Sequence, residues 1–157
     1  EEGLEGVQIA MDLNVSPQLV SNIKHGHRKL HKDIAKTSLA TYDCPDYAME
    51  LLYEFSEGFT APVLRGKAIE QHRLAFKEFL RNEAKEAFEK LKEVNLMKSP
   101  SNADKEDVEQ IKGLIAELDD TEIAIANFKR ILAKEYCISL KELKKQRAAT
   151  LKAKGWI

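Results

Sequence analysis

Glycine, proline and cysteine are all scarce in this chain of 157 residues, which has seven glycines, four prolines and two cysteines. So few glycines and prolines favour helices and argue against a sandwich or barrel built from many short strands. The two cysteines, Cys44 and Cys137, lie far apart without CxxC spacing. We therefore expect reduced thiols and a cytoplasmic protein, while the spacing alone leaves a disulfide open.

Long apolar runs are missing as well. The longest uncharged stretches fall far short of the ~18 residues that a membrane span requires, and no signal-peptide pattern opens the chain. The sequence also has no GxSxG, no glycine-rich phosphate loop, no HExxH and no ExxH pair of the kind that holds two iron ions in a helical bundle. We expect no membrane partner, no enzymatic activity and no cofactor.

The net charge of −1 conceals an uneven distribution of charged residues. Residues 24–36 contain five basic side chains and one acid, residues 43–57 contain five acids and no base, and residues 141–154 contain six bases and one acid. Local fields of opposite sign therefore persist in a chain that is nearly neutral as a whole.

The first forty residues have the signals of two short helices joined by a tight turn. Apolar residues from Leu4 to Leu13 recur at helical spacing, and Asn14 then favours a turn. Ser16 followed by Pro17 is a strong helix start, and Gly26 ends the second helix. Because the connection is only two or three residues long, the helices must cross in helix-turn-helix geometry. Two further helices are expected over residues 30–42 and 46–56.

The remainder of the chain predicts a long helical hairpin. Residues 57–66 contain two glycines and a proline, which indicates a boundary. Two amphipathic runs follow, over residues 67–97 and 105–136, with a break or kink expected at residues 118–122 where the apolar phase shifts. Ser139 and Glu142 have capping-box spacing, which predicts a last basic helix through residue 153. We expect an all-α protein: a helix-turn-helix domain over residues 1–57, a linker over 58–66 and a long antiparallel hairpin over 67–157.

Two amphipathic helices alone leave much of an apolar stripe exposed, so we expect the chain to self-associate, most simply as a dimer with a four-helix arrangement. The basic C-terminal end is either a second nucleic-acid contact or a partner-binding helix, and an ordinary solvated helix that packs Leu140, Leu143 and Leu151 is an equal alternative.

The stretch GVQIAMDLNVSPQLVSNIKHG resembles the helix-turn-helix of the lambda-repressor-like (Xre/Cro) DNA-binding family, over about residues 4–40. The sequence departs from the family in two ways. Asn14 stands where the family usually has glycine, and the family's preceding helix has almost no room before Leu4, so that helix is either truncated or missing. The matching positions are Ala10, Leu13, Val15, Ser16, Val20, Ser21, Asn22, Ile23 and Gly26.

The resemblance implies that the second helix, over residues 16–25, lies in the major groove of double-stranded DNA. Gln18 and Asn22 are four residues apart, so they share a helix face, and each can form the two-bond amide contact to adenine. The basic residues after Gly26 would contact phosphates. The candidate DNA-binding residues are Ser16, Pro17, Gln18, Ser21, Asn22, Lys24, His25, His27, Arg28, Lys29 and Lys32.

The closely spaced histidines His25, His27 and His31 raise the question of a metal site, but Cys44 is the only nearby thiol and no paired ligand spacing precedes it. We therefore expect no metal. The predicted function is that of a sequence-specific transcriptional regulator of bacterial or phage type. Two alternatives stay open: a DNA-packaging adapter of the phage small-terminase type, which would form a larger ring, and a protein-interaction module whose DNA surface is vestigial.

Overall fold

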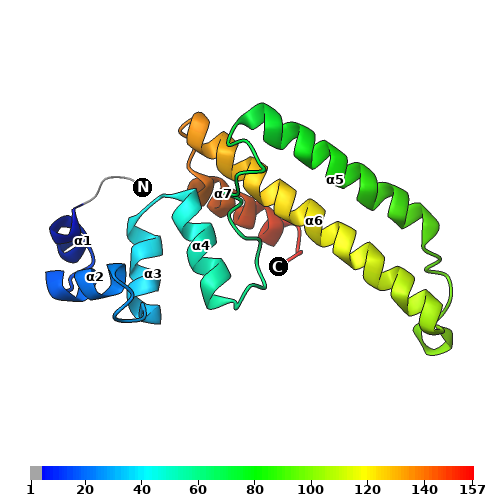
Figure 1. Ribbon diagram of the computed structural model, residues 1–157, viewed down its shortest axis with the longest axis horizontal. Coiled ribbons are helices and arrows are strands. Elements are labelled where there is room, and N and C mark those ends of the chain that lie inside the picture. The colour runs from blue at the N-terminus through cyan, green and yellow to red at the C-terminus, as the bar shows by residue number, and fades with distance from the viewer. Residues whose placement is uncertain (1–4) are drawn as a thin grey trace. The chain divides into compact units, whose positions relative to one another are not determined.

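The computed structural model describes residues 5–157 (Figure 1). Within that range the chain forms seven α-helices, one short 3₁₀ helix and no strand, which confirms the all-α prediction. No helix in the described part of the chain is both long and apolar enough to span a bilayer. Cys44 and Cys137 are free thiols.

The described residues divide into two compact units, the first ending at Cys44 and the second running from Pro45 to Ile157. The sequence instead placed a domain boundary after Glu57. The structure groups helix α4 with the second unit because α4 packs against α6 and supplies Asp46 to it. The first unit contains α1 (Gly6–Asp12), α2 (Pro17–Lys24) and α3 (Lys32–Thr41), and the second contains α4 (Pro45–Phe55), α5 (Arg73–Glu93), η1 (Pro100–Asn102), α6 (Lys105–Glu135) and α7 (Leu140–Ala153).

Helix α1 ends in a turn that aims the chain into α2. Asn14 adopts a left-handed conformation with φ of 52°, and the Val15 amide donates to the Ala10 carbonyl at 2.9 Å. The Asn14 amide donates to the Met11 carbonyl, so both bonds of a Schellman motif are present. Asparagine tolerates this conformation better than most side chains, which explains how it can stand in place of glycine.

The core of the first unit is small, and its buried residues are Ala10, Val20, Ala35 and Ser38, contributed by all three helices. The Tyr42 hydroxyl donates to an Asp12 carboxylate oxygen at 2.9 Å, which ties the segment after α3 to the end of α1. Helices α1 and α2 pack against each other, and the small Ala10 at their contact allows a close approach.

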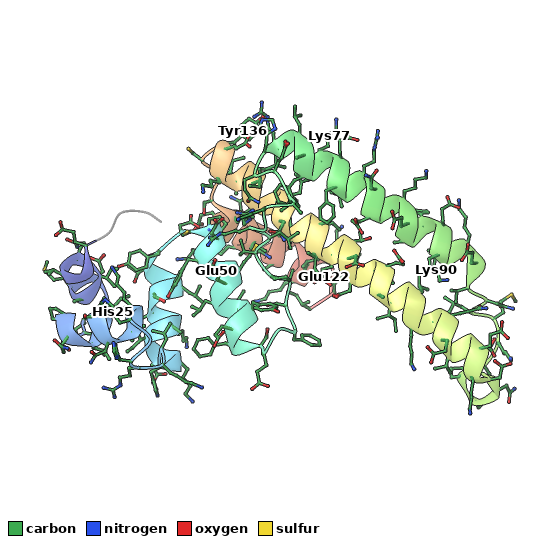
Figure 2. The ribbon with its side chains drawn as sticks, viewed as in Figure 1. His25, Glu50, Lys77, Lys90, Glu122 and Tyr136 are labelled. Carbon is green, nitrogen blue, oxygen red and sulfur yellow. The ribbon has the colours of Figure 1, made fainter. Side chains whose placement is uncertain are left out.

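In the second unit, α5 and α6 lie side by side and run in opposite directions (Figure 1). Lys77 and Lys90 mark the two ends of α5 in Figure 2. Asp104 and Asp107 form a capping box at the start of α6, each carboxylate accepting from the other residue's amide. The break predicted at residues 118–122 is absent, because α6 is uninterrupted. The apolar phase shifts because α6 packs against α5 along its length, whereas its C-terminal half also contacts α4 and residues 62–64.

A buried arginine lies where α6 meets α4 and the start of α5. The Arg130 side chain is 2% exposed, and its Nη1 donates to both Asp46 carboxylate oxygens at 3.1 Å. Its Nη2 donates to Gln71 Oε1 at 2.8 Å, and its guanidinium lies 5.7 Å from the centre of the fully buried Phe76 ring. Arg65 donates to Asp46 from the outer side at 3.0 Å.

The segment predicted as a linker is held against α6 by the side-chain amide of Asn127. Asn127 is fully buried; its Oδ1 accepts from the Leu64 amide and its Nδ2 donates to the Pro62 carbonyl, both at 2.9 Å. Gln71 Nε2 also donates to the Leu64 carbonyl at 2.9 Å. We call residues 60–71 the strap, because they cross α6 without regular secondary structure of their own.

The predicted helix over residues 67–97 is too long at both ends, since α5 spans Arg73–Glu93. His72 is the N-cap, with its Nδ1 accepting from the Leu74 amide at 3.3 Å. The Arg73 amide and guanidinium both donate to the Glu135 carboxylate, at 3.0 and 2.7 Å. These contacts fix the start of α5 at Arg73, and the preceding residues serve the strap instead.

At the capped end of α7, only half of the predicted box is formed. Ser139 Oγ accepts from the Glu142 amide at 3.0 Å, while the Glu142 carboxylate pairs with Lys145 at 2.7 Å instead of returning to Ser139. The basic helix itself spans Leu140–Ala153, as predicted.

Asp46→Ala should destabilise the second unit strongly, because it leaves the buried Arg130 guanidinium without a carboxylate. Breaking a buried ion pair from one side costs about 3–5 kcal/mol. Urea unfolding of the whole chain measures the loss. The matched control is Glu78→Ala, which removes a carboxylate from the exposed pair with Arg81 and should cost about 0–1 kcal/mol. Equal losses for the two variants would contradict the role of Arg130.

The same pair makes stability depend on pH. Burial raises the pKa of the Asp46 carboxyl, but hydrogen bonds and charge from Arg65 and Arg130 outweigh it and hold the pKa below 3.8. This contribution is therefore fully present above pH 3.8 and is lost as the pH falls through the lower folded-state pKa. Asp46→Asn, which cannot titrate, should flatten the unfolding free energy in that acidic range; an unchanged slope would rule Asp46 out as its source.

Candidate nucleic-acid interface

Helix α2 turns one polar face to solvent. Ser16 caps its first turn, with Oγ accepting from the Leu19 amide at 3.2 Å, and Pro17 occupies the first helical position. Val20 on the opposite side is buried. The polar face is formed by Gln18, Ser21, Asn22 and His25, which are spaced three or four residues apart.

The side chains on this face are ordered among themselves. Gln18 Nε2 donates to Asn22 Oδ1 at 3.3 Å. The His25 ring nitrogen Nδ1 lies 2.8 Å from the Ser21 carbonyl oxygen, and the His25 and His27 rings are 6.0 Å apart. Gln18 is exposed and Asn22 half-buried, so both amides keep donor and acceptor capacity for a partner.

A glycine directs the basic segment away from α2. Gly26 has φ of 72°, a conformation that residues with a Cβ adopt at a cost, and the His27 amide donates to the Asn22 carbonyl at 2.8 Å. The chain therefore leaves α2 through a defined turn and runs along residues 27–31 to α3. Lys24, Arg28, Lys29 and Lys32 are all exposed, and no acid among residues 5–157 forms an ion pair with them.

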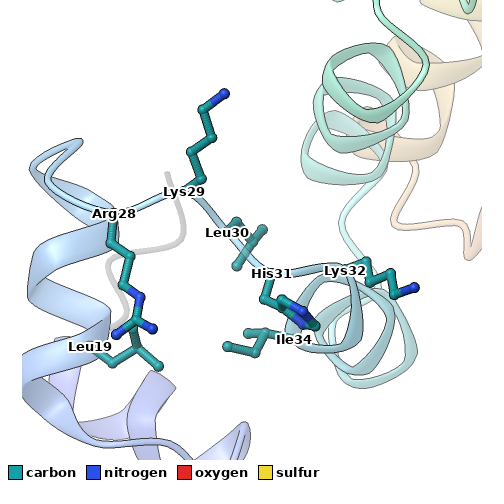
Figure 3. A pocket seen from close by; sticks show the side chains of 7 residues that line it. All are labelled: Leu19, Arg28, Lys29, Leu30, His31, Lys32 and Ile34. Carbon is teal, nitrogen blue, oxygen red and sulfur yellow. The ribbon is translucent and has the colours of Figure 1, made fainter.

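The basic segment and α2 border an open hollow of about 500 Å³ (Figure 3). Its apolar wall consists of Leu19, Leu30 and Ile34, and its remaining lining residues are Arg28, Lys29, His31 and Lys32. In Figure 3 the Arg28 side chain points back towards Leu19 of α2, and the Lys29 side chain extends away from the hollow. The rim can accept an anionic group such as a phosphate.

The three neighbouring histidines have separate local roles. His31 caps α3, with Nδ1 accepting from the Asp33 amide at 3.4 Å and lying 3.3 Å from the Asp33 carboxylate. His25 contacts the last turn of α2, as described above. Across the described residues 5–157 no group of three or more histidine, cysteine or carboxylate side chains is arranged to hold a metal ion.

The candidate residues from sequence come together on one short stretch of surface, from Ser16 at the start of α2 to Lys32 at the start of α3. Ser16 and Pro17 serve the helix start, which leaves the exposed Gln18 and Ser21 and the half-buried Asn22 as the remaining polar candidates on α2. Lys36 was not among the candidates. It lies one turn after Lys32 on α3 and is exposed, and its place in the basic run was the available signal.

Compared with known proteins, the chain has no significant match to a protein-family model, to a curated protein or to a solved structure.

Ser16→Ala should destabilise the first unit by about 0.5–2 kcal/mol, because the free amides of the first turn of α2 lose their acceptor. Thermal unfolding followed by circular dichroism measures the change. Ser16→Asp, which retains an acceptor at the N-cap, should restore most of the stability. If Ser16→Asp is as unstable as Ser16→Ala, the cap is not what holds α2.

Proposed function

We propose that this protein is a sequence-specific binder of double-stranded DNA that acts as a transcriptional regulator, with α1 and α2 as a helix-turn-helix and α2 in the major groove. The observation that carries the proposal is the amide-bearing face of α2, accompanied by Lys24 at the end of the helix and by Arg28, Lys29 and Lys32 beyond it, none of which forms an ion pair with an acid among residues 5–157. An α-helix fits the major groove, where bases differ in their pattern of donors and acceptors.

The residues divide between two tasks. Gln18 and Asn22 would contact base edges, because amides can donate and accept at once as adenine requires. Ser21 between them is small enough for a close approach to the backbone. The hydrogen bond between Gln18 and Asn22 is long, at 3.3 Å, and exposed. Exchanging it for contacts to a base therefore costs little free energy.

The cations would supply affinity without sequence preference. Each of Lys24, Arg28, Lys29 and Lys32 that meets a phosphate releases condensed counterions, which makes binding depend on salt. No intramolecular ion pair in the described structure must be broken first. Lys36 extends this row along α3.

The deciding experiment is selection of bound duplexes from a random-sequence pool at near-physiological salt. Enrichment of a defined motif supports a regulator. Binding without enrichment would remove sequence-specific recognition and favour the packaging adapter, and no binding would refute the DNA-binding function altogether.

Gln18→Ala should weaken binding to the selected sequence by about 1–3 kcal/mol and relax preference at one base position. The chain offers a matched control in Gln8→Ala, because Gln8 is also exposed and also donates to a residue four positions later, Asp12, at 2.7 Å. Fluorescence anisotropy with matched and mismatched duplexes measures the affinity of each variant, and only Gln18→Ala should lose affinity for the matched duplex. If both variants bind alike, α2 does not read bases.

Lys29→Ala should weaken binding to all sequences about equally and reduce the slope of log K against log salt by about one. Lys67→Ala, an exposed lysine of the second unit, is the control and should leave the slope unchanged. A change of sequence preference in Lys29→Ala would show that Lys29 contacts bases rather than phosphates.

A further inference from the structure

The half of the α5–α6 pair that includes the connecting loop has an apolar face with no cover among the described residues. We call this the distal face, formed by the exposed side chains of α5 and α6 between residues 88 and 118. Phe88 is 66% exposed, Ile115 59% and Leu118 50%. Such large exposed apolar groups on a long amphipathic helix mark an interaction surface. Leu91 and Val108 complete the set.

These side chains lie on the same side of the helix pair. Phe88 follows the buried Ala87 by one residue, and Ile115 follows the buried Leu114 by one residue. Each is thus turned 100° in the same sense from a residue in the α5–α6 seam. In two antiparallel helices, equal turns of this kind point to the same face of the pair.

The same face of α6 continues towards its C-terminal end. Lys129 lies eighteen residues, or five full turns, after Ile111 and therefore on the same line along α6. Partial burial and the charge of Lys144 on α7 lower the pKa of Lys129, so Lys144 lies near this part of α6, while the Lys129 side chain remains exposed. Further towards the N-terminal end of α6, Ile115 and Leu118 on this face are at least half exposed, and no described residue covers them.

The opposite face of the distal half has a different character. Glu83 and Glu86 on α5 face Glu117 and Asp120 on α6, and burial together with these neighbouring carboxylates raises the pKa of Glu83. Lys90 crosses to α6 on that part of the pair, where its Cε would lie 3.2 Å from a Cβ added at Gly113, so the absence of a side chain at Gly113 makes room for it. One face of the distal half is therefore acidic and the other apolar, which limits apolar docking to a single face.

We propose that the distal face binds a second copy of this chain, related by a two-fold axis near Ile115, so that two α5–α6 pairs form an antiparallel four-helix arrangement. A closed two-fold contact pairs identical patches. Apolar side chains then meet their own equivalents, and the ends of the two helix pairs that lead into α7 point away from each other.

Charge along the edge of the face fits this partner. Lys112 and Asp119 lie seven residues apart, hence on one edge of α6, on either side of Ile115. An antiparallel copy of α6 therefore brings Lys112 opposite the partner's Asp119 at both ends of the contact. Within the described part of the chain Lys112 pairs with the exposed Glu109 at 2.7 Å, a contact that is readily exchanged.

Light scattering on the whole chain tests the proposal, and its result does not depend on whether the first unit binds DNA. We expect twice 17.8 kDa for the natural chain and 17.8 kDa for a folded Ile115→Asp variant, with helicity by circular dichroism unchanged because Ile115 is exposed. Glu86→Lys on the acidic face should remain dimeric. A monomeric natural chain, a larger ring, or a dimeric Ile115→Asp variant would overturn the proposal.

The orientation is tested by charge exchange and by cross-linking. Lys112→Asp and Asp119→Lys should each weaken the dimer several-fold, and the double variant should restore it. In a Cys44→Ser, Cys137→Ser background, Ile115→Cys should form a disulfide-linked dimer on mild oxidation and Glu86→Cys should not. Failure of the double variant to recover, or equal cross-linking at both sites, would exclude this two-fold contact.

Discussion

The Arg130 guanidinium has lost nearly all contact with water, and three other segments must supply oxygens or a ring face to it. Asp46 comes from α4, Gln71 from the strap and Phe76 from α5. An uncompensated buried charge is among the most costly defects a small protein can contain. The packing of α4, the strap and the start of α5 on α6 is therefore cooperative, because each segment supplies part of the environment of Arg130. This shared contact is the physical reason that α4 belongs to the second unit.

The first unit is held together in a different way. Most of its defining contacts are local: a left-handed Asn14, a serine cap, a left-handed Gly26 and a histidine cap, each acting over two to five residues. Its buried side chains are few and mostly small. Such a unit places a short helix and the segment after it accurately on the surface with little core.

This difference explains what could be predicted from the sequence. The helices of the first unit, the serine cap and the stop at Gly26 follow from signals between neighbours, and the structure has them at the predicted places. The start of α5 was wrong by six residues because Ile69 continues the apolar period, whereas contacts from Glu135 and Arg130 decide the boundary. No local pattern reveals that Arg130 pairs with a carboxylate 84 residues away. The candidate residues lie close together in the structure for the same reason, since they are contiguous in the sequence, and their role stays a prediction.

Asn127 gives the strap an unusual place among connections that lack regular structure. Irregular segments commonly accept added or deleted residues, because their backbone groups are satisfied by water. In the strap, the Leu64 amide and the Pro62 carbonyl are both satisfied by one side chain of α6, so the register of these residues is set as firmly as in a helix. Natural variation in chain length should therefore accumulate at the turn between α5 and α6, around residues 95–104, and be almost absent between residues 60 and 71.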